Sequence, residues 1–465
     1  MQPAEVRAFD PSASTLYHEQ WVFRHIYDDM SWFDKEQKPD PKLALSWRNV
    51  DPLTWEIKLR TGVKFSNGEP FNADAVVESF KYLTRPEAVT RAGLATWTAI
   101  EKVDDATVNV KTTVPDPRFL GSLINVVVMP PGVLKSNPAS LVEKPIGTGP
   151  YKLAEWVKGD RIVLEANADY WRGKPKIDRI IIKSAPEASA RVAALQSGQA
   201  DVISNVPPES VDLLDKGANT KVLPVTGLRN VTIIFDTRTK PLDNVLVRRA
   251  LNHAVDKESI IRNILGGRAT IQTGTTHPLT PSHNNDLKPY AYDPQKAKQL
   301  LAEAGFPNGF EIEFHHPTGR WIKDVEVSQA VASMLEAVGV RAKLATGEYG
   351  TYISTWNKGE YGGMAMIGTL NLVEPDEVLQ RFLYSKGTWP HSVKDPKIDA
   401  FYESEAKELD PAKRTQILQE AEAYVNDQAY WLFLYFQGEL YGANKRMKWT
   451  PPVNEHLIFW DADVE

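Results

Sequence analysis

The stretch IDRIIIKSAPEASARVAALQSGQADVIS, residues 177–204, decides the fold class of this chain. Its first part, 177–185, is a nearly continuous apolar run, which is typical of a strand buried on both faces. Residues 187–198 have helical periodicity and end at Gly198, a residue type that commonly terminates helices. Residues 200–204 predict a second buried strand, so we expect a βαβ unit whose two strands are parallel.

The α/β pattern continues on both sides of this stretch. Downstream, VTIIFD (231–236) predicts another buried strand, and Asp293 followed by Pro294 predicts the start of a helix that ends at Gly305. Upstream, the alternating stretch TWEIKLR (54–60) predicts a half-buried strand, and Asn72 predicts the N-cap of a helix. The first third is therefore rich in strands, and the rest alternates strands with helices.

Length and composition exclude several classes of protein. A chain of 465 residues exceeds the size at which one hydrophobic core stops growing, about 250–300 residues, so we expect at least two domains. A net charge of −6 provides no basic face for nucleic acid or an anionic membrane. The absence of cysteine excludes a disulfide framework, a cysteine–zinc site and a cysteine nucleophile.

Two observations concern the compartment. The chain has no run of about 18 apolar residues, so we expect no transmembrane helix. Its start, MQPAEVRAFDPSAS, has no charged region followed by an apolar stretch. We therefore expect that a secretory signal is either absent or was removed before Gln2.

Five long segments resemble one protein family, in the family's order along the chain. Together they resemble the dipeptide/oligopeptide/nickel class of ABC-transporter solute-binding proteins. The segments are VDPLTWEIKLRTGVKFSNGEPFNADAVVESF (50–80), PIGTGPYKL (145–153), ANADYWRGKPKIDRIIIK (166–183), KPLDNVLVRRALNHAVDKESII (240–261) and YDPQKAKQLLAEAGFPNGF (292–310).

The resemblance implies an α/β, two-lobed periplasmic-binding-protein type II-like architecture, with an extra domain inserted in the first lobe. The first lobe would comprise residues 1–28, 176–236 and 438–465, with the strand-rich inserted domain at 29–175. The second lobe would comprise 237–437, with the ligand enclosed between the lobes by hinge closure. The implied protein is a periplasmic or cell-surface monomer whose partners are a small-molecule ligand and the membrane permease of an ABC importer.

The segment TGRWIKD (318–324) is the first candidate for ligand contact. It lies between a predicted strand and a predicted helix, and Arg320 offers a rigid fork of donors suited to a carboxylate or phosphate. In dipeptide binders of the family, an Arg in this stretch holds the ligand's carboxylate beside an aromatic residue, which here is Trp321. The alternative role for Arg320 is a salt bridge between the lobes.

The second candidate lies in MIGTLNLVEPDEVL (366–379). Peptide-binding relatives carry G-W-x-x-D shortly before Pro-Asp, and that Asp takes the peptide's ammonium group. Here GTLN (368–371) has no Trp, and no acid precedes Glu374. Either Glu374 substitutes for the missing acid, or the ligand has no free amine and its hydroxyls suit Asn371, which both donates and accepts hydrogen bonds.

Three further side chains complete the candidate site. Tyr17 and His18 follow Asp10-Pro11, a pair after which family members often place ligand contacts. Trp389 lies in a loop-like segment, where an indole can stack on a sugar ring. The full set of candidate ligand-binding residues is Arg320, Trp321, Asn371, Tyr17, His18, Trp389 and Glu374.

No motif for catalysis or metal binding is present. The chain lacks a GxSxG elbow, an HExxH motif and a Walker A loop, so we expect a binding protein rather than an enzyme. His315 and His316 are adjacent on a predicted strand and point to opposite faces, which disfavours one metal ion between them. We therefore expect no catalytic residue, no metal and no cofactor.

The ligand class follows from the missing acid. An opine-like or phosphorylated sugar conjugate, or an oligosaccharide, is the preferred ligand, and a peptide or modified peptide is the alternative. An enzyme or a chaperone on the same scaffold is the further alternative. Paired carboxylates or a Ser/His pair in the cleft would indicate the enzyme, and an exposed apolar patch without an enclosed cavity would indicate the chaperone.

Overall fold

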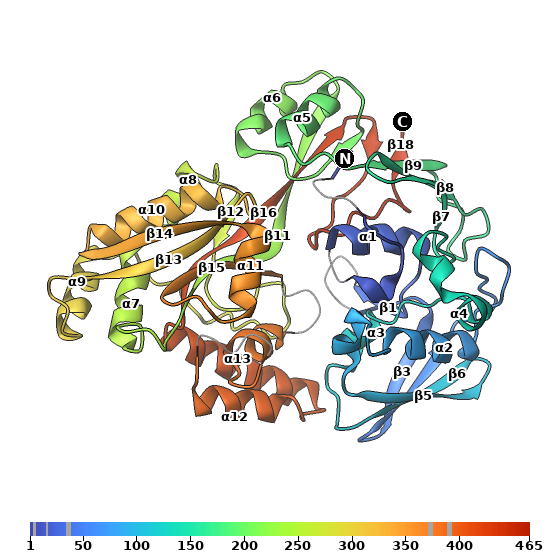
Figure 1. Ribbon diagram of the computed structural model, residues 1–465, viewed down its shortest axis with the longest axis horizontal. Coiled ribbons are helices and arrows are strands. Elements are labelled where there is room, and N and C mark those ends of the chain that lie inside the picture. The colour runs from blue at the N-terminus through green and yellow to red at the C-terminus, as the bar shows by residue number, and fades with distance from the viewer. Residues whose placement is uncertain (3–5, 15–16, 34–38, 371–374, 388–392) are drawn as a thin grey trace. The chain divides into compact units, whose positions relative to one another are not determined.

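The chain folds into two compact units, each with its own hydrophobic core. The computed structural model describes residues 1–2, 6–14, 17–33, 39–370, 375–387 and 393–465 (Figure 1). Unit 1 comprises Met1–Val225 and Leu440–Glu465, and unit 2 comprises Thr226–Glu439. The two-lobed α/β class predicted from the sequence is confirmed, whereas the predicted lobe boundaries and the inserted domain at 29–175 stay predictions.

Unit 1 contains most of the short strands. Its helices are α1 (Tyr17–Ile26), α2 (Ala73–Leu83), α3 (Phe119–Leu123), α4 (Pro131–Ser136), α5 (Ala188–Gln196) and α6 (Val211–Asp215). Its strands are β1 (Ser31–Phe33), β2 (Pro39–Pro41), β3 (Ala44–Asp51), β4 (Thr54–Leu59), β5 (Trp97–Asp104), β6 (Thr107–Thr112), β7 (Tyr151–Val157), β8 (Arg161–Ala166), β9 (Arg179–Lys183), β10 (Val202–Ile203), β17 (Met447–Lys448) and β18 (Asp463–Val464).

Unit 2 alternates strands with helices around one large sheet. Its helices are α7 (Val245–Ala254), α8 (Lys257–Asn263), α9 (Pro294–Glu303), α10 (Asp324–Glu336), α11 (Tyr349–Asn357), α12 (Pro396–Glu405) and α13 (Pro411–Asp427). Its strands are β12 (Ala269–Ile271), β13 (Phe310–Thr318), β14 (Val340–Glu348) and β15 (Met364–Leu370). Two longer strands, β11 (Thr220–Phe235) and β16 (Trp431–Asn444), have residues in both units.

The large sheet has the order β10–β16–β11–β15–β13–β14, and β12 pairs with β16. β13 runs parallel to both β14 and β15, whereas β11 runs antiparallel to β15. Helices α7 and α9 lie beside the end of this sheet, and α12 and α13 form a separate helical pair (Figure 1). The carboxyl ends of β13, β14 and β15 therefore lie at one edge, and that edge positions the candidate site.

Local capping signals in the sequence are confirmed. The Asn72 side chain accepts a hydrogen bond from the amide of Ala75 at the start of α2. The Asp293 side chain accepts one from the amide of Lys296 at the start of α9. Such caps depend on three or four neighbouring residues, which is why the sequence predicts them. None of the helices in the described part is both long and apolar enough to cross a membrane.

The βαβ unit predicted for 177–204 is wrong in two respects. α5 forms as expected, but β9 pairs with β8 in a three-stranded sheet, while β10 pairs with β16 in the large sheet. β9 is not buried on both faces either, because the Ile181 side chain is 53% exposed. The apolar run correctly indicated a strand, but its burial depends on a neighbour that the periodicity does not specify.

A buried arginine between two carboxyl groups joins the start of the segment 375–387 to α12 and α13. Arg414 Nε donates to Glu405 Oε2 over 2.9 Å, and Arg414 Nη2 lies 3.4 Å from Asp376 Oδ1. Burial and then the negative charge of Asp376 raise the pKa of Glu405 to about 9. Glu405 therefore keeps its proton at neutral pH, which leaves one negative charge facing one guanidinium.

We predict that this cluster makes stability fall in alkaline solution. The pKa of Glu405 is raised from 4.5 to about 9, so its stabilising contribution is complete below pH 4.5 and is lost as the pH rises through about 9. Urea unfolding should show a loss on the order of 1–3 kcal/mol between pH 6 and pH 9. Glu405→Gln should remove most of that loss, whereas Glu420→Gln, an exposed change on α13, should keep it. Equal pH profiles for the wild-type chain and Glu405→Gln would contradict this prediction.

Candidate functional site

The candidate site lies at the carboxyl edge of β13, β14 and β15. These strands end at Thr318, Glu348 and Leu370, and a loop or helix follows each of them. In open α/β sheets, ligands bind at the carboxyl ends of the strands, where the loops present side chains and backbone amides. In unit 2 this edge therefore carries the residues that the sequence singled out at 318–324.

One carboxylate fixes the loop after β13. Asp324 accepts hydrogen bonds from the amides of Gly319 at 3.1 Å, Arg320 at 2.8 Å, Trp321 at 3.1 Å and Val325 at 2.9 Å. Gly319 has a φ of +74°, a backbone region that favours glycine. Since Asp324 is buried, the loop cannot move without leaving several amides and a charge unsatisfied.

Trp321 is packed against the end of β15. Its side chain is 5% exposed, and a Cβ atom placed on Gly368 would come within 2.3 Å of the indole Nε1. The ring meets Tyr349 edge-on, with 6.1 Å between the ring centroids. Nε1 of Trp321 is buried and has no hydrogen-bond partner among the described residues. This N–H is therefore an unsatisfied donor within the packing at the end of β15, as far as the described residues show.

The Arg320 guanidinium lies over these aromatic rings. Its Cζ is 5.2 Å from the centroid of Tyr349 and 5.9 Å from that of Trp321. Within the described part of the chain, its guanidinium makes no hydrogen bond and no ion pair. A guanidinium on a rigid loop, with aromatic rings beneath it, can bind a carboxylate or a phosphate through its paired N–H donors.

Polar side chains from β11 and β16 hold the same edge. Asn230 Oδ1 accepts from the amide and the hydroxyl of Thr369 at 2.9 and 2.5 Å. Gln437 Oε1 accepts from the amide of Ile322 at 3.1 Å, and its Nε2 donates to Glu439 at 3.0 Å. The sequence analysis missed these residues and Asp324. A polar residue directly after the apolar run WLFLYF (431–436) was the available signal for Gln437.

The predicted ligand-binding residues lie in different parts of the chain, and only some of them are described by the structure. Arg320 and Trp321 lie together in the site. Asn371, Glu374 and Trp389 lie outside the described residues. Tyr17 and His18 lie in the first turn of α1 in unit 1, and their side chains are outside the described part.

The two adjacent histidines each have a separate structural role. His316 is buried, and its Nε2 lies 2.9 Å from the hydroxyl of Thr346. His315 stacks on Tyr361 with 4.3 Å between the ring centroids, and its Nε2 lies 3.2 Å from a carboxylate oxygen of Glu313. Among the described residues, no group of three or more side chains could hold a metal ion.

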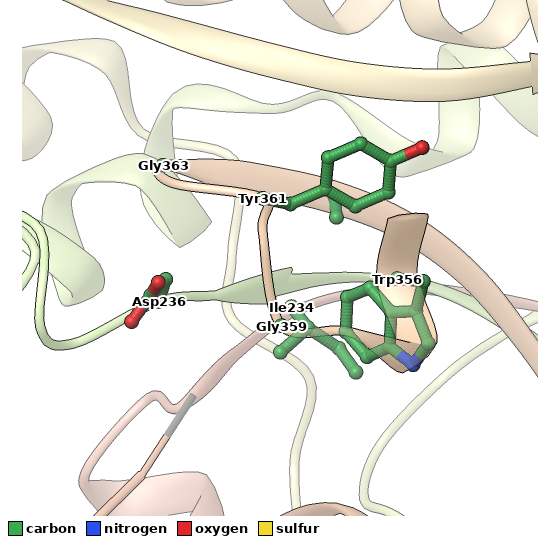
Figure 2. A pocket seen from close by; sticks show the side chains of 7 residues that line it. Ile234, Asp236, Trp356, Gly359, Tyr361 and Gly363 are labelled. Atoms are coloured by element: carbon green, nitrogen blue, oxygen red, sulfur yellow. The ribbon is translucent and has the colours of Figure 1, made fainter. Parts of the chain in front are cut away.

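A small cavity lies at the opposite end of β15 and is too small for a solute. Figure 2 shows Asp236 on one side of it and the Trp356 ring on the other, with Tyr361 above. Its volume is about 10 Å³, which is room for about one water molecule. Asp236 is already paired with both Nε and Nη2 of Arg238, at 2.8 and 2.7 Å. This cavity is therefore structural.

Comparisons with known proteins identify the family of this chain. Residues 38–390 match the profile of the bacterial extracellular solute-binding proteins, family 5 Middle. Heme-binding protein A of Haemophilus influenzae is 31% identical over 451 residues, covering 88% of this chain and 81% of its own length. The glutathione-binding protein GsiB of Escherichia coli K12 is 29% identical over 479 residues, covering 98% and 92%.

Two solved structures extend the comparison. The periplasmic binding protein DppA from Helicobacter pylori, in complex with the peptide STSA, has a TM-score of 0.84 at 25% identity and covers 100% of this chain and 97% of its own. AgaA from A. tumefaciens R10, in complex with agropinic acid, has a TM-score of 0.82 at 24% identity and covers 100% and 98%. The likeness to AgaA shows the fold alone.

We predict that Asp324 is the main support of the Arg320 loop. Asp324→Ala leaves four amides without their shared acceptor, so the free energy of unfolding should fall by about 2–4 kcal/mol. Asp286→Ala, at an exposed position in unit 2, should change it by less than about 0.5 kcal/mol. Chemical denaturation measures both variants. Similar small effects in the two variants would show that the carboxylate does not hold the loop.

Proposed function

Since this chain belongs to the bacterial extracellular solute-binding proteins of family 5, we propose that it captures a small organic anion whose carboxylate or phosphate binds Arg320. Proteins of this family bind solutes rather than catalyse reactions, and they work with the membrane permease of an ABC importer. We propose further that the chain acts as a monomer in the periplasm or at the cell surface.

This proposal rests on the guanidinium of Arg320. It has no counter-ion in the described part of the chain, while the loop that bears it is fixed by Asp324. A cation that is held in place without a partner loses little conformational entropy when it binds an anion. The buried ring of Trp321 lies beside it, with the Arg320 Cζ 5.9 Å from the ring centroid. The guanidinium therefore favours a ligand with an anionic group.

The ligands of the relatives agree with an anionic group. Heme and glutathione, which the two relatives are named for binding, each carry two carboxylates, and the peptide STSA ends in one. A carboxylate is thus a group that chemically different ligands of this family share. It supports anion binding at Arg320 without selecting one ligand.

The sequence at the end of β15 favours an opine-like or phosphorylated sugar conjugate over a peptide. GTLN (368–371) supplies no acid for a free ammonium group, whereas Asn371 suits hydroxyls. An oligosaccharide without a charge would leave Arg320 unused, so the charged conjugates rank first. A peptide is the second candidate, because GsiB is 29% identical over 98% of this chain.

We predict that calorimetry will separate these classes. An opine-like conjugate should bind with micromolar or tighter affinity, while glutathione and free dipeptides should bind much more weakly because their ammonium lacks a carboxylate partner. Native mass spectrometry of the purified protein should show a co-purified solute that carries a carboxylate or phosphate. Micromolar binding of several unrelated dipeptides would favour the peptide class instead, and a bound solute without any anionic group would contradict both.

We predict that Arg320 supplies much of the binding energy. Arg320→Ala should weaken binding of the captured anion by about 2–5 kcal/mol and change the melting temperature little, because among the described residues the guanidinium contacts only the rings of Tyr349 and Trp321. Arg320→Lys keeps the charge but loses the fork, so its affinity should be intermediate. Arg341→Ala removes an exposed arginine from the neighbouring β14 and should leave affinity unchanged. An unaltered dissociation constant for Arg320→Ala would refute the assignment.

A further inference from the structure

The chain passes between its two units only twice, in two neighbouring strands. β11 leaves unit 1 between Val225 and Thr226, and β16 returns to it between Glu439 and Leu440. The two strands are hydrogen-bonded neighbours in the large sheet (Figure 1). In β11 the exposure changes at the same place, since Thr226 is exposed whereas all residues from 227 to 235 are buried. Any flexing of the chain between the units therefore passes through these few residues.

We call the residues Gly227, Gln437, Gly438 and Glu439 the crossing point, because they lie together at this boundary. A Cβ atom placed on Gly227 would come within 2.4 Å of the carbonyl oxygen of Gln437 and within 3.0 Å of Cγ of Glu439. Glycine inside a strand often marks such a close approach of another backbone. The amide of Gly438 donates to the carbonyl oxygen of Arg268 at 3.0 Å. The two strands are thus in tight contact where they change units.

One side chain of the crossing point reaches the loop of Arg320. Gln437 is 6% exposed, its Oε1 accepts from the amide of Ile322 at 3.1 Å, and its Nε2 donates to Oε1 of Glu439 at 3.0 Å. Both ends of this buried amide are bonded, so its orientation is fixed: a rotated amide would place donor against donor at Ile322. Hydrogen bonds therefore run from the loop through Gln437 to Glu439, which in turn packs on Gly227.

The loop and the crossing point cannot move independently without losing a buried hydrogen bond. Asp324 makes the loop rigid, because it accepts from the successive amides of residues 319–321. A displacement of the loop therefore carries the amide of Ile322 with it and either breaks its bond to Gln437 or moves that side chain. Since Gln437 is buried, a broken bond leaves polar groups without water as a replacement. Joint movement costs less.

We propose that Gln437 is a positioning residue that couples the Arg320 loop to the crossing point, with Glu439 as its second anchor. Coupling is reciprocal, so a change that orders the loop also steadies β11 and β16, and a bend in these strands shifts the loop. The inference rests on the proposed function for its consequence, which is that an anion bound to Arg320 stiffens both strands. The coupling itself belongs to the chain without a ligand, so its test is separate from that of anion binding.

The alternative is that Gln437 only satisfies a buried amide. Its removal would then lower the stability of the chain, but it would not change how the crossing point responds to a change in the loop. The two roles therefore differ in that response and not in stability, and pairs of variants measured alone and together can separate them.

Hydrogen exchange in the full-length chain without ligand measures the response. The amide of Ile322 reports on the loop, and the amide of Gly438 reports on the crossing point. Gly319→Ala perturbs the loop, because Gly319 has a φ of +74° that other residues rarely adopt. It should speed exchange at both reporters by at least about threefold. Gly305→Ala is a matched change at a φ of +90° just after α9 and should leave both unchanged.

The same loop change is then made in a Gln437→Met background. Methionine fills a similar space but forms neither hydrogen bond, so exchange at Gly438 should no longer respond to Gly319→Ala, whereas exchange at Ile322 still should. Gln416→Met, on the exposed face of α13, is the control and should keep the full response of Gly438.

An exchanged pair tests the chemistry of the link. The double variant Gln437→Glu with Glu439→Gln keeps one carboxylate and one amide in the same two places. The carboxylate can accept from both the amide of Ile322 and the amide side chain beside it, so the response of Gly438 should return. Gln437→Glu alone places two carboxylates together and loses the donor, so it should abolish the response even where Gln437→Met does not fold.

Two results would overturn the coupling. One is a Gly319→Ala variant in which exchange speeds up at Ile322 but not at Gly438. The other is a response at Gly438 that is equally large with and without the hydrogen bonds of Gln437. Neither result bears on the anion proposed for Arg320, because no ligand is present in these measurements. Conversely, an unaltered affinity of Arg320→Ala would refute the anion site and leave this coupling in place.

Discussion

Strand β16 is the element on which both units depend. All of its residues from Trp431 to Ala443 are buried, and it has residues in both compact units. A buried strand needs a partner for every backbone group, and buried side chains supply several of them. Asn252 bonds to the carbonyl of Trp431 and the amide of Phe433, and Gln272 accepts from the amide of Leu434. Because its backbone is satisfied in this way, β16 gives β11, β10 and β12 a fixed strand to pair with.

Contacts with the large sheet fix the geometry of the candidate site. Gln437, still within β16, accepts from the amide of Ile322 and so ties the loop of Arg320 to this buried strand. Asp324 fixes the same loop from within the start of α10. The backbone of the loop that bears Arg320, the residue we propose for ligand binding, is thus held by contacts from two elements. An orientation set before the ligand arrives lowers the entropy that binding costs.

The sequence predicts those parts of the fold that depend on near neighbours. The apolar stripe of α10, the caps at Asn72 and Asp293, and Arg320 with Trp321 after a strand are all local patterns. The partners of β9 and the roles of Gln437 and Asn230 depend on residues far away in the chain, and no periodicity encodes them. Ile181 shows the limit most clearly, since its apolar neighbours indicate burial that the fold does not provide.

The other buried arginines of the chain differ from Arg320 in their hydrogen-bond partners. Arg191 is buried and donates to four backbone carbonyls, and buried Arg248 donates to three. Arg414 is likewise enclosed by two carboxyl groups. In these places hydrogen bonds or carboxyl groups offset the cost of removing a guanidinium from water. Arg320 is half-buried on a fixed loop without such partners in the described part of the chain, so its hydrogen-bonding capacity is available to an anion from outside.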